Sequence, residues 1–173
     1  ALVNGKVIGL SHGRFEWGPR ALGNRSILAD PRRAEMKEVV NSKIKFREPY
    51  RPFAPVILED RAKDFFDGIT GFEDQYTARY MVLVLPWKGD AGDRIPAVNH
   101  LGTGRLQTVR KEWNPRYYRM VEKFDEATGV PVLMNTSFNL RGEPIVSSPA
   151  DTWNTFSNSG MDGLVLGQYW VEK

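Results

Sequence analysis

Short apolar runs recur along the chain with the lengths that are typical of strands. The run from Met81 to Leu85 is the most continuous, and we expect it to be a buried strand that Pro86 stops, because proline cannot donate to a strand ladder. Six further runs favour strands: residues 6–10, 53–58, 104–110, 130–134, 164–166 and 169–171. The pattern therefore predicts one central sheet.

Helical apolar spacing alternates with these runs. A capping residue followed by proline, which is a helix-start signal, occurs at three places: Asp30-Pro31, Asn114-Pro115 and Ser148-Pro149. The first helix should end near Lys43, the second at Gly129 and the third at Gly160. A shorter helix is expected at residues 59–66. This alternation predicts the α/β (α+β) class, with a mixed sheet and helices in a single domain over residues 1–173.

Composition narrows the possible chemistry. The 173 residues include no cysteine and two histidines, which excludes disulfides, thiolate metal sites, a cysteine nucleophile and a His-rich metal site. We therefore assign no metal ligands in this chain. No apolar run is long enough to span a bilayer, so we expect a cytoplasmic protein without membrane contact. The net charge of +3 mildly favours anionic partners.

Two motifs combine cations with residues that shape the backbone. The first motif, residues 13–26, places Arg14, Arg20 and Arg25 among three glycines, which suits phosphate or carboxylate binding as well as a solvated surface loop. The second motif, residues 43–55, has four cations in nine positions and three prolines that restrict the backbone. Its aromatic residues would also suit single-stranded nucleic acid.

Two further motifs place polar residues at strand ends. The third, residues 100–109, holds His100, two glycines and Arg105, and it lacks the last glycine of a dinucleotide fingerprint. A structural or solvent-exposed role for His100 is the commoner alternative. The fourth, residues 131–145, runs from a strand into Asn135, Ser137 and Asn139, which suits ligand contacts or a turn with side-chain-to-backbone bonds. No protein nucleophile is evident.

Together and in this order, the four motifs resemble the C-terminal domain of O-carbamoyltransferases, the family of nodulation and antibiotic-biosynthesis carbamoyltransferases. The segments that carry the resemblance are GRFEWGPRALGNRSI, IKFREPYRPFAP, HLGTGRLQTV and NTSFNLRGEPI. One departure is Gly104 directly before Arg105, where the family more often has a small residue such as alanine. That glycine would either loosen Arg105 or let the backbone approach more closely.

The resemblance implies a YrdC-like domain, a curved mixed sheet flanked by helices around a basic cavity, which makes carbamoyl-adenylate from carbamoyl phosphate and ATP with Mg²⁺. A metal-binding, Kae1-like N-terminal domain of the same polypeptide, absent from this chain, would transfer the carbamoyl group to a hydroxyl. Lys45, Arg51 and Arg105 are the expected catalytic residues. The expected substrate-binding set comprises Arg20, Lys45, Arg51, His100, Arg105, Asn135, Ser137, Asn139 and Arg141.

Two other functions compete with this one. Stand-alone YrdC proteins make threonylcarbamoyl-adenylate, although the motifs match the carbamoyltransferase form better. A nucleic-acid-binding module is disfavoured, because the cations stand beside glycines and prolines instead of forming one long stripe. If the carbamoyl-activating function is correct, the four motifs should meet at one cavity lined by Arg20, Lys45, Arg51 and Arg105.

Overall fold

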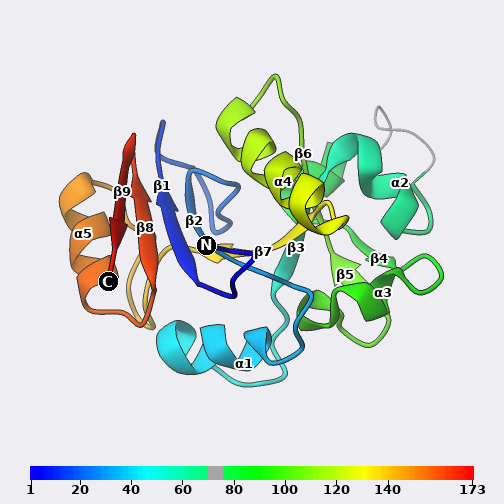
Figure 1. Ribbon diagram of the computed structural model, residues 1–173, viewed down its shortest axis with the longest axis horizontal. Coiled ribbons are helices and arrows are strands. Elements are labelled where there is room, and N and C mark those ends of the chain that lie inside the picture. Colours follow the sequence, from blue (N-terminus) through cyan, green and yellow to red (C-terminus); the bar gives the residue numbers. More distant parts are fainter. Residues whose placement is uncertain (70–75) are drawn as a thin grey trace.

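A computed structural model describes residues 1–69 and 76–173 (Figure 1). Its centre is a seven-stranded mixed sheet in the order β6-β3-β7-β2-β1-β8-β9. The strands of this sheet are β1 (Ile8–Ser11), β2 (Arg25–Ala29), β3 (Ala54–Leu58), β6 (Gln107–Val109), β7 (Val132–Ser137), β8 (Gly163–Leu166) and β9 (Tyr169–Glu172). A separate antiparallel pair joins β4 (Val84–Pro86) to β5 (Thr103–Arg105). The predicted class, a mixed sheet flanked by helices in one domain, is confirmed.

The helices are short except for two. These two are α4 (Pro115–Thr128) and α5 (Pro149–Ser157). The shorter α-helices are α1 (Met36–Val40), α2 (Ala62–Phe65) and α3 (Ala91–Arg94). The other helical turns are the π-helix η1 (Asn41–Lys45) and the 3₁₀ turns η2 (Glu59–Arg61), η3 (Tyr76–Tyr80) and η4 (Pro96–Val98). In the described part of the chain, none of these helices has the length and apolar composition that a membrane span requires.

The two long helices begin where the sequence predicted. The side chain of Asn114 accepts the backbone N–H of Tyr117, and Gly129 ends α4 with a left-handed φ of 72°. Ser148 and Asp151 form a reciprocal capping box at the start of α5. These caps satisfy backbone groups that helix ends leave unpaired, so local sequence alone fixes both boundaries.

The two long helices cover opposite faces of the sheet. Phe124 of α4 shares an apolar groove with Ile8 of β1. The hydroxyl of Thr152 in α5 lies 3.1 Å from that of Ser11, at the other end of β1. Because side chains alternate along a strand, Ile8 and Ser11 point to opposite faces. In Figure 1, α5 accordingly lies beside β8 and β9, and α4 lies over β7 and β3.

Two sequence predictions are wrong, and one strand was not predicted. No helix starts at Asp30-Pro31: the Asp30 carboxylate accepts the backbone N–H of Arg32, as a cap would, and also its guanidinium, but residues 31–35 form turns and α1 begins six residues after Asp30. The run from Met81 to Leu85 is no buried strand, since β4 begins at Val84 and the Val84 side chain is exposed. A strand that the sequence did not reveal, β2, lies in the middle of the sheet between β1 and β7.

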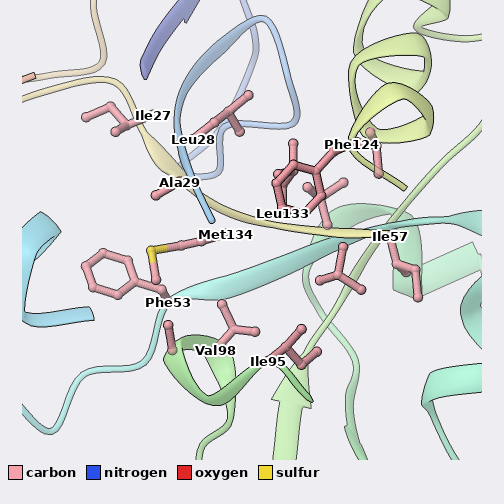
Figure 2. Packing of buried hydrophobic residues seen from close by; sticks show 14 of the residues in the cluster. Ile27, Leu28, Ala29, Phe53, Ile57, Ile95, Val98, Phe124, Leu133 and Met134 are labelled. Atoms are coloured by element: carbon pink, nitrogen blue, oxygen red, sulfur yellow. The ribbon is translucent and has the colours of Figure 1, made fainter. Parts of the chain in front are cut away.

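The core lies on both sides of β7. Figure 2 shows Leu133 and Met134 of this strand among buried side chains from β2, β3, α4 and η4. Full burial of each such aliphatic or aromatic side chain stabilises the fold by about 1.5–3 kcal/mol. Toward its end β7 becomes polar and half-buried, at Thr136 and Ser137. β7, which pairs with both β2 and β3, therefore has its polar end at the edge of the core.

Gly23, directly before β2, is a position that only glycine fits. Its φ is +112°, in the region that side-chain-bearing residues rarely adopt. A Cβ there would lie 2.2 Å from the ring of Tyr117, a side chain of α4 with no exposed surface. The loop between β1 and β2 is thereby packed tightly against α4.

Candidate functional site

Residues from all four sequence motifs line one cavity, which has a volume of about 160 Å³. Four of its lining residues are arginines, so we call it the arginine cavity. Its wall also includes the polar end of β7. The residues that line it are Pro19, Arg20, Ala21, Arg47, Arg51, Pro52, Phe53, Ala54, Met81, Arg105, Asn135, Thr136 and Ser137.

The amide of Asn135 ties the first motif to the sheet. Its Nδ2 donates to the carbonyl of Ala21 at 3.0 Å and to Oε1 of Gln107 at 2.7 Å, and Nε2 of Gln107 donates to the carbonyl of Leu22. Asn135 and Gln107 are both buried strand residues. These bonds fix the backbone next to Arg20, which lies in the loop between β1 and β2.

Arg47 forms a rigid part of the wall. Its backbone N–H and carbonyl are both bound by the side-chain amide of Asn41 in η1. Its guanidinium lies 4.3 Å from the centre of the Phe53 ring and donates to the carbonyl of Pro52. A guanidinium held by stacking keeps its remaining donors in fixed directions.

Lys45 lies beside the cavity rather than among its lining residues. The side chain is buried, and Nζ contacts the carbonyl and hydroxyl of Ser137 and the carbonyl and Oδ1 of Asn139. Burial, followed by the charges of Arg47 and Arg51, lowers the pKa of Lys45 to about 7. Lys45 therefore does not line the cavity as predicted, and it contacts the cavity wall through Ser137.

The arginines of the cavity repel one another. Burial, then Arg51 and Arg105, lowers the pKa of Arg47 to about 10, and burial followed by Arg20 and Arg51 lowers the pKa of Arg105. The buried Nε atoms of Arg47 and Arg105 have no hydrogen-bond partner in the described parts of the chain. Uncompensated cations with free donors are an arrangement that an anion would stabilise.

Acidic groups are sparse at this site. No carboxylate is among the described residues that line the cavity, and the nearest ion pair joins exposed Arg51 to exposed Glu48 at 3.7 Å. Such an exposed pair contributes little. Within residues 1–69 and 76–173, no three His, Asp or Glu side chains are placed to hold a metal ion.

Three other expected binding residues lie outside the wall. Asn139 accepts from Lys45 at 2.8 Å and from the Ser137 hydroxyl at 2.7 Å, so it positions both groups. Arg141 is exposed and donates to the carbonyl of Phe46. His100 pairs through its backbone with Thr103 at the start of β5, and it does not line the arginine cavity. The structure thus brings together Arg20, Arg51, Arg105, Asn135 and Ser137 but not His100 or Arg141.

The glycine before Arg105 permits close packing. Gly104 is buried, and a Cβ there would lie 2.5 Å from the Trp87 ring and 3.1 Å from the Phe66 ring. These two rings stack with centroids 4.2 Å apart. Of the two possibilities that the sequence left open, the second is therefore correct: the glycine lets the backbone of β5 approach the core.

Sequence reasoning missed two residues of this region. Arg47 is in the second motif, but nothing in the sequence separates a stacked arginine from a solvated one. In the sequence, Gln107 is only the residue that replaces the last glycine of the dinucleotide fingerprint, whereas in the structure its amide supports Asn135 and Leu22. A polar residue at a buried strand position was the available signal for Gln107.

Comparison with known proteins agrees with the motifs. Residues 1–173 match the family model described as carbamoyltransferase C-terminus. Nodulation protein NolO of Bradyrhizobium diazoefficiens is 47% identical over 99% of this chain and 31% of its own length. Nodulation protein NolNO of Sinorhizobium fredii is 47% identical over 99% of the chain and 25% of its length. The 3'-hydroxymethylcephem-O-carbamoyltransferase of Amycolatopsis lactamdurans is 39% identical over 100% of the chain and 32% of its length.

The chain thus spans about a quarter to a third of these relatives. The family model covers the four motifs that form the arginine cavity as well as the strands and helices around it. Because the match extends over the full 173 residues, the chain belongs to the carbamoyltransferase C-terminus family.

Proposed function

We propose that this chain is the carbamoyl-activating part of an O-carbamoyltransferase, which binds ATP with Mg²⁺ and carbamoyl phosphate and makes carbamoyl-adenylate. The hydroxyl acceptor would receive the carbamoyl group from a Kae1-like part of the same polypeptide. The observation that carries the proposal is the arginine cavity, in which four guanidinium groups meet without a lining carboxylate among the described residues. Family membership supports it, since one relative is named as an O-carbamoyltransferase.

The proposed chemistry needs anion binding rather than a protein nucleophile. Water hydrolyses carbamoyl phosphate to carbamate and inorganic phosphate, and a carbamate oxygen then attacks the α-phosphorus of ATP and displaces pyrophosphate. The attack brings two anions together, so fixed cations must offset their repulsion and stabilise the charge on the phosphorus. Arg20, Arg51 and Arg105 would hold the phosphates, and Lys45 would keep Ser137 and Asn139 in place.

The first test is turnover by the chain itself. With ATP, Mg²⁺ and carbamoyl phosphate, we expect pyrophosphate release that requires all three. Release that requires threonine and bicarbonate instead would favour threonylcarbamoyl-adenylate synthesis. Tight binding of single-stranded nucleic acid that weakens steeply with salt, without pyrophosphate release, would favour the nucleic-acid function. Either result would contradict the proposal.

Binding should also depend on pH through Lys45. In the free protein its pKa is lowered to about 7, whereas an anion in the cavity favours the protonated form. Wild-type affinity for pyrophosphate should therefore fall relative to that of Lys45→Met as the pH rises from about 6 to 9, with proton uptake on binding. Calorimetry in buffers of different ionisation enthalpy measures both effects. Comparing the two proteins at each pH removes the titration of pyrophosphate, and a constant affinity ratio would contradict the prediction.

A further inference from the structure

The carboxylate of Glu16 accepts three backbone N–H groups of the loop that carries Arg20. Its Oε1 accepts the N–H of Leu22 at 2.8 Å and of Asn24 at 3.1 Å, and its Oε2 accepts the N–H of Arg25 at 3.0 Å. Each of these backbone groups would otherwise need another acceptor. This one side chain therefore holds the backbone between Arg20 and the start of β2 in a fixed conformation.

The same short stretch is held from its other side. Asn135 and Gln107 bind the carbonyls of Ala21 and Leu22, while Glu16 binds the N–H groups that follow. Leu22 is therefore bound through both its N–H and its carbonyl. Arg20 itself is exposed and projects from this fixed stretch into the arginine cavity wall. An arginine on an ordered backbone loses less conformational freedom when it binds an anion.

The chemistry of the contact requires a carboxylate. Three N–H donors converge on two oxygens, and glutamine would place an NH₂ donor against at least one of them. Burial raises the pKa of Glu16, and the three backbone donors oppose that shift. Glu16 is not one of the cavity's lining residues, so its negative charge serves the loop and not the ligand.

We propose that Glu16 is a positioning residue, which orders the loop of residues 16–25 so that Arg20 is presented to an anion in the arginine cavity. This inference rests on the anion-binding part of the proposed function. It predicts that Glu16 affects binding only through Arg20. A purely structural carboxylate would lower stability without a specific effect on anion affinity.

A double-mutant cycle tests the coupling. Calorimetry with inorganic pyrophosphate compares wild type with Glu16→Gln, Arg20→Ala and the double variant. We expect Glu16→Gln to weaken binding by about 10-fold, the effect of losing one hydrogen bond to a charged group. The double variant should bind no more weakly than Arg20→Ala alone. Unchanged affinity in Glu16→Gln, or a loss in the double variant equal to the product of both, would overturn the inference.

Asp162→Asn is the matched control, because the Asp162 carboxylate also accepts a backbone N–H, that of Val7 at 2.7 Å, and does not line the cavity. It should lower the melting temperature and leave pyrophosphate affinity within 2-fold of wild type. Hydrogen exchange adds a readout without ligand: the amides of Leu22, Asn24 and Arg25 should exchange faster in Glu16→Gln. If that variant does not fold, Glu16→Asp replaces it in the same cycle.

The results separate this inference from the proposed function. Pyrophosphate binding with the expected coupling, but no turnover of ATP and carbamoyl phosphate, would refute the function and leave the inference standing. Turnover by wild type together with independent effects of Glu16 and Arg20 would do the reverse. A wild-type protein that does not bind pyrophosphate would refute both.

Discussion

Replacing Lys45 by alanine should lower pyrophosphate release from ATP and carbamoyl phosphate by about 10²-fold or more, because Ser137 in the cavity wall loses the group that positions it. The side chain is buried, and four oxygen atoms of Ser137 and Asn139 contact its Nζ. Removing it takes a donor from each of these acceptors, although Oδ1 of Asn139 keeps the Ser137 hydroxyl and the Ser137 carbonyl keeps the Asn139 N–H. The free energy of unfolding should therefore also fall by about 1–3 kcal/mol. Because Lys45 is buried, the loss of activity should come together with a loss of stability.

Arg51→Ala separates the two effects. Arg51 lines the arginine cavity, but about half of its side chain is exposed, and its partner Glu48 is equally exposed. Its loss should reduce turnover by about 10²-fold while the free energy of unfolding changes by no more than about 0.5 kcal/mol. Initial rates and urea denaturation of both variants measure this contrast. Unchanged rates in both would remove the second motif from the active site.

The largest loss of stability should come from Gly23→Ala. A left-handed φ costs an alanine about 1–2 kcal/mol, and a methyl group 2.2 Å from the Tyr117 ring adds an overpacking cost of about 1–3 kcal/mol. Tyr117 has no exposed surface into which it can move. We therefore expect the free energy of unfolding, measured by urea denaturation, to fall by about 2–5 kcal/mol.

Gly89→Ala provides the comparison for this variant. Gly89 also has a positive φ, +54°, but a Cβ there would meet no atom within 4 Å. It should therefore show the backbone cost alone, about 1–2 kcal/mol. Equal destabilisation by the two variants would mean that Tyr117 does not constrain the loop before β2.

Local signals explain which elements the sequence predicted well. Asn114 and Ser148 cap α4 and α5 with bonds to residues three positions away, so their effect is visible in a short window of sequence. Asp30 has the same local signature and accepts the N–H of Arg32 as a cap would, yet no helix follows until Met36. A cap bond alone therefore does not show whether the residues after it continue as a helix.

Non-local pairing explains the missed strand and the misplaced one. Arg25 begins β2, although its side chain is charged, because its guanidinium donates to the carbonyls of His12, Asn24 and Ser147. Val84, although apolar, lies in a two-stranded antiparallel pair opposite Arg105, outside the large sheet. Neither result could be read from hydrophobicity, since each depends on a partner that is distant in sequence.

The sequence predicted the residue types of the candidate site more fully than their arrangement in space. Of the four arginines that line the cavity, the motifs predicted three: Arg20, Arg51 and Arg105. They did not reveal the support of these residues by Glu16, Asn41 and Gln107, because such support acts between side chains and backbone in three dimensions. Supporting contacts of this kind have no spacing rule.

The position of β1 in the sheet has a consequence for how the chain folds. This strand lies between β2 and β8, and the Val7 amide is bound by Asp162, 155 residues away. β2 in turn pairs with β7. During synthesis the first two strands therefore have only each other until the last quarter of the chain has left the ribosome. Such long-range pairing slows folding, so the half-made sheet, with apolar surface uncovered, is the stage at which aggregation competes with folding.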